Sequence, residues 1–245
     1  MYKFSSSADQ NTWDTLMAQD LHWFEIQVKV NNVAYSQDQI MNISTDWLMF
    51  SEEQPTVGAC LSAEIELQMI KPSVTIPRMA KIEPFVRVTD GTTTSAWMPQ
   101  GVFYVDTREE SRNNDNLPFI SFHGYDAMLK TEEVFPDYTG TWTSKACDEV
   151  VELIADAIDV GIDDRTYDVF DTFEYSISPP VGYTMREVLS NIAAMYAGNW
   201  VMSLEGKLLL VALSDLPVET SLLVDQSGNV ITFGEDAISL ADTTV

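Results

Sequence analysis

The sequence predicts an α+β fold that is mainly β, and three observations support this prediction. Residues 61–69 alternate between apolar and polar side chains without exception, which is the period of a half-buried strand. Two aromatic and β-branched runs, 97–106 and 119–130, flank a polar link rich in asparagine, a pattern typical of paired strands joined by a long exposed loop. After Lys130 the apolar residues follow the period of amphipathic helices instead.

Length and composition favour a globular protein. The 245 residues, of which 45% are hydrophobic, suffice for one large or two ordinary domains with a substantial core. The N-terminus has no apolar signal region, and the longest clean apolar run, 208–213, is far shorter than the roughly 20 residues of a membrane span. We therefore expect no membrane insertion by this chain, and folding in a cytoplasm or export without a cleavable signal.

The charge balance is strongly acidic, with 38 acids, 13 lysines and arginines, and a net charge of -25. Such a chain repels phosphate backbones, which argues against a sequence-specific nucleic-acid binder. Thirteen of the acids lie in residues 131–175, where they are opposed only by Lys145 and Arg165. This run is interpreted either as a solvated face or as a repulsive wall past which a polyanion moves.

The N-terminal half reads as a succession of strands. The first twenty residues are polar and without period, so we expect an arm or loop there. Strands are predicted from Phe24 through residue 30, with a turn at Asn31 and Asn32, and over residues 40–44 with Ile43 facing inward.

A further strand is predicted over residues 80–88. Pro84 lies inside it and predicts an edge strand or a bulge, because proline cannot donate to a ladder. Asp90 and Gly91 then form a turn. Residues 24–125 thus hold enough strands to close a small barrel or to pack a sandwich.

Two helices and a hairpin follow. Ser144 is the expected cap of a helix that ends before Gly161, and Thr184 with Glu187 forms the capping box of a second helix that ends before Gly198. The segments 200–204 and 207–213 form a hairpin around a Glu-Gly turn. The apolar stripes comprise Cys147, Val150, Val151, Ile154, Ala155 and Ile158, then Met185, Val188, Leu189, Ile192, Ala193 and Tyr196.

These elements predict three parts. Residues 1–130 form a β-domain, 131–215 an acidic α+β insertion domain, and 216–245 the start of a second β part, with strand patterns at 221–224 and 230–233. Residues 216–245 are too few for a complete second β-domain.

The residues indicate no catalytic, cofactor or metal site. His22 and His123 have no cysteine or carboxylate at a ligand spacing, and a packed or edge histidine is the simpler interpretation of His123. Cys60 and Cys147 are expected to be buried thiols, with a disulfide or a reactive thiol as alternatives. A cation site remains a lesser alternative at Asp159, Asp163, Asp164 and Asp168, whose spacing departs from an EF-hand.

Three segments in this order resemble the gp27-like hub proteins of phage tail tips and baseplates, the tail-associated N-terminal domains of phages and prophages of Gram-positive bacteria. They are the strand entry 57–65 (VGACLSAEI), the segment 97–106 (WMPQGVFYVD) with its return 120–129 (ISFHGYDAML), and 183–200 (YTMREVLSNIAAMYAGNW) with the hairpin behind it. The resemblance implies a tail-tube-like β-barrel with an inserted two-helix and β-hairpin domain, and a second barrel for which residues 216–245 are too few.

The resemblance also implies a function. It predicts a non-enzymatic structural hub of a virion tail, assembled in the bacterial host cytoplasm as a homotrimer whose ring continues the tail tube. The tail tube or distal tail protein and other baseplate proteins are the expected partners, and DNA passes through the lumen without specific binding. The alternatives are an accessory tail adhesin or β-domain with exposed aromatic residues for glycans, and a tail-associated cell-wall hydrolase. The loop 109–118 is expected to touch a neighbouring subunit.

Overall fold

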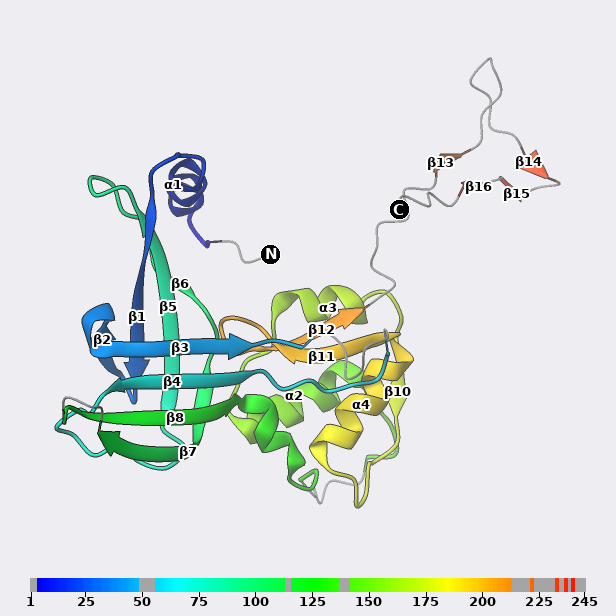
Figure 1. The fold of residues 1–245 in the computed structure, drawn as a ribbon. Helices are drawn as coiled ribbons and strands as arrows, with labels where there is room; N and C mark the ends of the chain where they lie inside the picture. Colours follow the sequence, from blue (N-terminus) through cyan, green and yellow to red (C-terminus); the bar gives the residue numbers. More distant parts are fainter. Residues whose placement is uncertain are drawn as a thin grey trace, which may run out of the picture.

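A computed structural model of the chain describes residues 4–48, 56–112, 116–136 and 142–212, together with short backbone segments between 221 and 240. Two bodies lie side by side in these residues (Figure 1). One is a curved sheet that carries the helix α1 (Ser7–Met17), and we call it the sheet body. The other contains three helices and a hairpin, and we call it the helical body.

The sheet body is a single antiparallel sheet of eight strands. Its path runs β2-β1-β5-β7-β8-β4-β3, and β6 pairs with β5 beside that path. The strands are Trp23–Val30 (β1), Val33–Ser36 (β2), Ile40–Asp46 (β3), Glu64–Ile70 (β4), Lys81–Thr89 (β5), Met98–Pro99 (β6), Phe103–Arg112 (β7) and Pro118–Asp126 (β8).

The predicted barrel is not closed in the described residues, where no ladder joins the end strands β2 and β3. The two end strands are instead consecutive in sequence and are linked by the short 3-10 turn η1 (Gln37–Gln39). All four residues of β2 pair with β1, and the chain leaves this ladder at the turn before β3 begins. The sheet curls around its core as an open sheet, which is a correction to the sequence prediction.

The core of the sheet body follows the predicted alternation. Leu61, Ala63, Ile65, Leu67 and Met69 are all buried, while the residues between them face outward or are half-buried. Burying such side chains stabilises a fold by about 1.5–3 kcal/mol each. The core also takes in side chains from β1, β2, β5, β7 and β8, including Val28, Tyr35, Ile82, Phe103 and Phe122.

The helical body contains α2 (Cys147–Ile158), α3 (Asp164–Phe170) and α4 (Met185–Met195) packed with the hairpin of β11 (Gly198–Met202) and β12 (Leu208–Ala212). Both predicted apolar stripes are buried, and the capping box of Thr184 and Glu187 is formed. The predicted cap at Ser144 is wrong: Ala146 precedes α2 without a side-chain cap. Lys145 and Ala146 instead form β9, paired with Ser176–Ile177 (β10).

Two polar segments differ from their predicted structure. The supposed N-terminal arm contains α1, whose Ser6 side chain accepts from the backbone N–H of Asp9 and whose Leu16 is buried. The supposed loop 109–118 is strand at both ends, because β7 continues to Arg112 and pairs with β8 as far as Pro118. Residues 113–115 lie outside the described part of the chain, so the expected contact of this loop with a neighbour stays a prediction.

Pro84 lies inside the sheet, opposite the gap between strands β6 and β7, rather than at an edge of the sheet. β5 is flanked by β1 on one side, and by β7 and then β6 on the other. The interruption between β6 and β7 falls opposite Pro84, whose carbonyl accepts from Gln100 N at 2.9 Å. The predicted irregularity is therefore present, but it lies in the partner strand.

The remaining described elements are few. The 3-10 helix η2 (Ala127–Glu132) leads from β8 into the helical body. Of the strand patterns predicted at 221–224 and 230–233, the backbone of Ser221–Leu222 (β13) and Thr232–Phe233 (β14) is described. The backbone of Asp236–Ala237 (β15) and Ser239–Leu240 (β16) is described as well. Among the described helices, none combines the length and apolarity needed to cross a membrane.

Candidate functional site

The two bodies meet where residues 56–61, ahead of β4, run beside β11. Gly58 N donates to Gly198 O at 2.8 Å, and Leu61 N donates to Trp200 O at 2.9 Å. The segment therefore lies as a third strand against the β11–β12 hairpin, visible in Figure 1 as the cyan chain leading into β4. We call this region, with the side chains of Asp126 and Arg186 described below, the junction.

Gly58 fits the junction because it lacks a side chain. Its φ is +80°, and an added Cβ would lie 3.1 Å from Ala194 Cβ and 3.3 Å from Ser190 O. Substitution therefore combines a left-handed backbone with a tight contact against α4.

We expect Gly58→Ala to lower the free energy of unfolding by about 2–3 kcal/mol, measured by urea denaturation. Gly182→Ala is the matched control, because Gly182 has φ +81° with nothing within 4 Å of an added Cβ. Alanine at 182 has the same unfavourable left-handed backbone but no tight contact with α4, so the free energy of unfolding should fall by less than in Gly58→Ala. Equal losses in the two variants would show that packing against α4 adds nothing.

Arg186 connects α4 to both neighbouring segments. Its Nη1 donates to Cys60 O at 2.6 Å, and its Nη2 donates to Met128 O and Ser62 Oγ at 3.2 Å each. Its Nε lies 2.6 Å from Glu132 Oε1, but the N–H does not point at an acceptor, so this contact is an ion pair only. The guanidinium thus holds together the entry to β4, η2 and α4.

Asp126 is a buried carboxylate at the end of β8, 1% exposed. Its Oδ2 accepts from Ala63 N at 2.7 Å and its Oδ1 from Met128 N at 2.9 Å. Burial raises the pKa of this carboxyl to about 6, although the two N–H donors and the charge of Arg186 favour the ionised form. Asp126 therefore fixes the geometry of the junction while carrying an unfavourable buried charge.

The junction brings together the three segments that carry the resemblance. Gly58 belongs to the first, Asp126 and Met128 to the return of the second, and Arg186 to the third. The sequence alone assigns no role to Arg186, which lies between the capping residues Thr184 and Glu187. A positive charge in the first turn of a helix is unfavourable because of the helix dipole. The position of Arg186 in the first turn of α4 therefore indicates that its guanidinium has a stabilising partner elsewhere.

A second candidate surface is the outward face of β3, β4, β8 and β7, which we call the polar face. The register aligns side chains of the four strands in rows across this face. The rows are Asn42, Gln68, Ser121 and Glu109; then Ser44, Glu66, His123 and Thr107; then Asp46, Glu64, Tyr125 and Tyr104.

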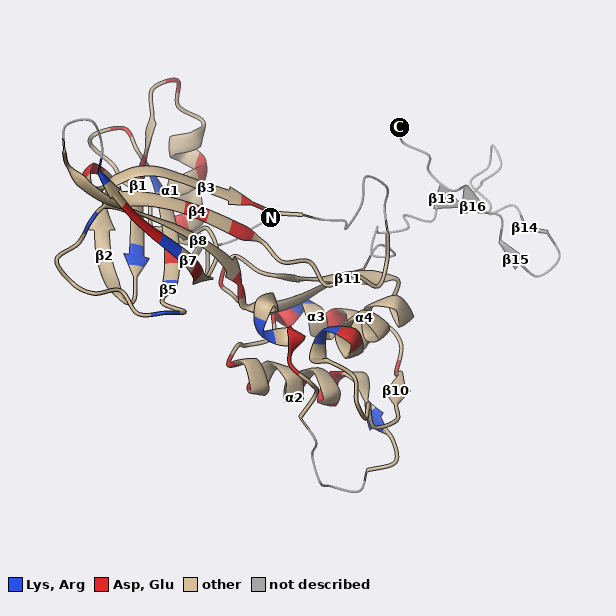
Figure 2. Cartoon of the chain, turned by 60° about the horizontal axis from the view of Figure 1, so that its bottom comes forward, with Lys and Arg blue, Asp and Glu red and all other residues tan. Residues whose placement is uncertain are grey.

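These rows contain four acids and no lysine or arginine. Figure 2 shows red segments and no blue ones along β3 and β4. Lys130 of η2 borders this face, with its Nζ 4.0 Å from the centre of the Tyr104 ring. At neutral pH such a face repels phosphate groups and offers them hydroxyls and amides rather than cations.

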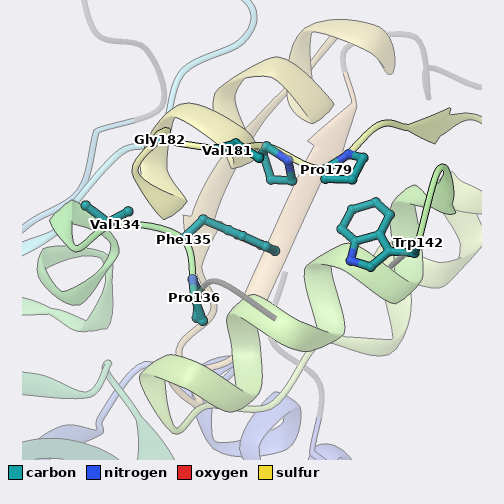
Figure 3. Close-up of a pocket in the computed structure, with 8 residues that line it drawn as sticks. Val134, Phe135, Pro136, Trp142, Pro179, Val181 and Gly182 are labelled. Atoms are coloured by element: carbon teal, nitrogen blue, oxygen red, sulfur yellow. The ribbon is translucent and has the colours of Figure 1, made fainter. Parts of the chain in front are cut away.

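The helical body carries an apolar groove of about 220 Å³, shown in Figure 3. Phe135 extends between Pro136 and the turn 179–182, and Trp142 lies across from it. Val134 and Val181 on its walls are 63% and 83% exposed. The groove holds no titratable side chain and is a packing surface rather than a reactive site.

The two histidines lie apart. His22 Nδ1 is 2.8 Å from Gln19 O near the end of α1. His123 lies on the polar face, with its Nε2 3.3 Å from Glu64 Oε2 and its ring edge against Tyr125. β8 lies between β7 and β4 within the sheet, so His123 is a packed histidine rather than one at an edge.

The cysteines and the acidic cluster show no reactive arrangement. Cys60 and Cys147 are both buried and not bonded to each other, as the simpler interpretation predicted. Burial raises the pKa of the Cys60 thiol to about 11, which makes it a poor nucleophile at neutral pH. Asp163 caps α3 and binds Arg165, and in the described residues no group of histidines, cysteines and acids is arranged to hold a metal.

Two solved structures share this arrangement of elements. The 43 kDa tail protein of prophage MuSo2 from Shewanella oneidensis matches 77% of this chain with a TM-score of 0.51 and 15% identity. The tail protein from Neisseria meningitidis MC58 matches 84% with a TM-score of 0.52 and 10% identity. The chain has the fold of tail proteins. This finding supports the coarser part of the prediction, a phage tail fold.

The match is one of fold and covers part of each neighbour. The chain spans 53% of the Shewanella protein and 58% of the Neisseria protein, a little over half of each. A chain of the Francisella PdpA–VgrG complex matches more loosely, with a TM-score of 0.45 and 9% identity over 83% of this chain and 30% of that one, and supports no conclusion. No family model and no curated protein matches the sequence.

Proposed function

We propose that this chain is a structural component of a phage or phage-like tail, specifically a gp27-like hub protein of the tail tip or baseplate. The fold shared with two tail proteins is the observation that supports this assignment. Three copies form a ring that continues the tail tube, in contact with the tube or distal tail protein and with other baseplate proteins. The hub has no enzymatic activity of its own, and its place is the virion tail, after assembly in the bacterial host cytoplasm.

The polar face gives this proposal its mechanism. A ring through which a genome moves needs a lumen that does not hold phosphate, because each cation that neutralises a phosphate adds affinity. The rows of the polar face offer Asp46, Glu64, Glu66 and Glu109 without a compensating lysine or arginine. We therefore place the polar face on the lumen side, with the sheet body as the tube wall and the helical body outside it.

Electron microscopy of the assembled particle tests the assembly directly. Three-fold symmetry at the position of this chain, with the polar face inward, is the expected result. A particle in which the chain is a monomer, without contact to the tube or to neighbouring baseplate proteins, would overturn the hub assignment.

Charge reversal tests the lumen. We expect Glu64→Lys combined with Glu66→Lys to slow DNA release from assembled particles about tenfold, which corresponds to about 1.4 kcal/mol of added DNA affinity. Asp156→Lys combined with Asp168→Lys is the matched control, because both acids are exposed on the helical body and the change in charge is the same. The control should release DNA at the normal rate. Equal slowing in both variants would contradict a lumen position of the polar face.

A further inference from the structure

A hollow of about 660 Å³ opens on the other half of the sheet body, beside η1 and the outer surface of β1 and β5. This volume lies within the roughly 300–1,000 Å³ typical of small-molecule sites. Its lining is mixed, with Trp97 and Arg87 on one side and the polar side chains of Glu25, Gln27, Gln37 and Asp38 around it. None of these residues takes part in the junction or in the polar face.

The Trp97 side of the hollow is held rigid by an ion pair. The Arg87 guanidinium carbon lies 4.4 Å from the centre of a Trp97 ring, in cation–π contact. Arg87 in turn donates from Nε to Glu25 Oε2 at 2.6 Å, with Nη2 2.5 Å from the same oxygen. The guanidinium therefore lies over one face of the indole and holds it in place, and we call this stack the Trp97–Arg87 wall. Because the stack is already ordered, less side-chain entropy is lost when a ligand binds.

The opposite side presents hydrogen-bonding groups of η1. Gln37 Oε1 accepts from Ile26 N at 3.4 Å, which ties the amide to β1. Asp38 Oδ1 accepts from the Ser36 hydroxyl, so the carboxylate has a fixed orientation and a second oxygen able to accept. Amides and carboxylates of this kind pair with neighbouring hydroxyls, since each hydroxyl both donates and accepts.

We propose that this hollow binds a neutral saccharide, with the sugar ring against the Trp97–Arg87 wall and its hydroxyls bonded to Asp38, Gln37 and Gln27. Three observations select this class of ligand: a stack of planar groups that can pack against ring C–H groups, polar side chains across from it, and the charge of the site. Arg87 is neutralised by Glu25, and Asp38 adds one negative charge to a chain whose net charge is -25. Phosphorylated or sulfated ligands are therefore repelled.

Saturation-transfer NMR on the purified full chain tests the proposal with maltotriose, cellotriose and chitotriose as probes. We expect saturation transfer to at least one of them, with a Kd near 1 mM or tighter. Trp97→Ala should weaken that binding at least tenfold, and Asp38→Asn severalfold. Trp97→Phe keeps an aromatic wall and should retain more of the binding than Trp97→Ala, provided that thermal unfolding shows all variants folded.

Trp142→Ala is the matched control, because it removes a tryptophan from the apolar groove instead. Its saccharide affinity should stay within twofold of the wild type. The proposal is overturned if none of the three probes receives saturation, if Trp97→Ala binds as the wild type does, or if Trp142→Ala abolishes binding. The assay uses the isolated chain, so its result is independent of whether the hub proposal holds.

Discussion

Arg186→Ala is expected to lower the free energy of unfolding by about 2–4 kcal/mol. The change removes the donor that serves the carbonyls of Cys60 and Met128, and each buried acceptor left without a partner costs about 1–3 kcal/mol. The loss falls at the junction, so we also expect faster amide hydrogen exchange in residues 56–61. Urea denaturation and hydrogen-exchange mass spectrometry measure the two effects.

Arg165→Ala provides the matched control for this experiment. Arg165 is also an arginine of the helical body, but it is 55% exposed and its ion pair is with Asp163 on its own segment. Exposed pairs of this kind contribute about 0.2–1 kcal/mol, so the loss should be much smaller. If the two variants lose equal stability, Arg186 does not connect the two bodies in the way its contacts indicate.

Asp126→Asn is expected to change how stability depends on pH. The pKa of Asp126 in the folded chain, about 6, lies above the ordinary value of 3.8, so the native state holds this proton more tightly than the unfolded state does. Its contribution to stability is full below pH 3.8 and is lost as the pH rises through about 6. Over that window the wild type should lose roughly 2–3 kcal/mol relative to the variant, at about 1.4 kcal/mol per pKa unit.

The informative quantity is how the difference in unfolding free energy between the wild type and Asp126→Asn changes with pH. Asparagine keeps one acceptor oxygen, so either Ala63 N or Met128 N loses its partner and the variant carries a constant loss. Asp163→Asn is the control of opposite sign, because Arg165 lowers the pKa of Asp163 and its contribution disappears as the pH falls. A flat difference between wild type and Asp126→Asn from pH 4 to pH 7 would show that the Asp126 carboxyl titrates as if exposed.

Much of the fold follows from local patterns in the sequence. The alternation over residues 61–69 reflects one buried and one exposed face. The stripes of α2 and α4 reflect packing into one shared core, in which α4 contacts β11 and α2 contacts η2, α3 and α4. These signals are strong because they repeat over several turns or strand residues. The secondary structure of the two polar segments could not be predicted, because they lack such a repeat. Only Leu16 of α1 is buried, so α1 has no apolar stripe. The end of β7 is paired through its backbone, which leaves no pattern in its side chains.

The junction was beyond prediction because its contacts are long-range. Arg186 lies 126 residues from Cys60, and Asp126 lies 63 from Ala63. No spacing rule connects such positions in a single sequence. The three segments that carry the resemblance are far apart in sequence, and in the structure they converge on one set of hydrogen bonds.

The third strand of the junction makes the two bodies depend on each other for stability. Residues 56–61 precede the helical body by some seventy positions yet complete the sheet of its hairpin. In a fragment beginning at residue 131, the backbone N–H and C=O groups at this edge of β11 would be unpaired, and such edges promote aggregation. The fragment would also lack the contact of Gly58 with α4. The two bodies are therefore expected to unfold as one cooperative unit. Mechanical force applied to one body should reach the other through the backbone hydrogen bonds of residues 56–61 with β11.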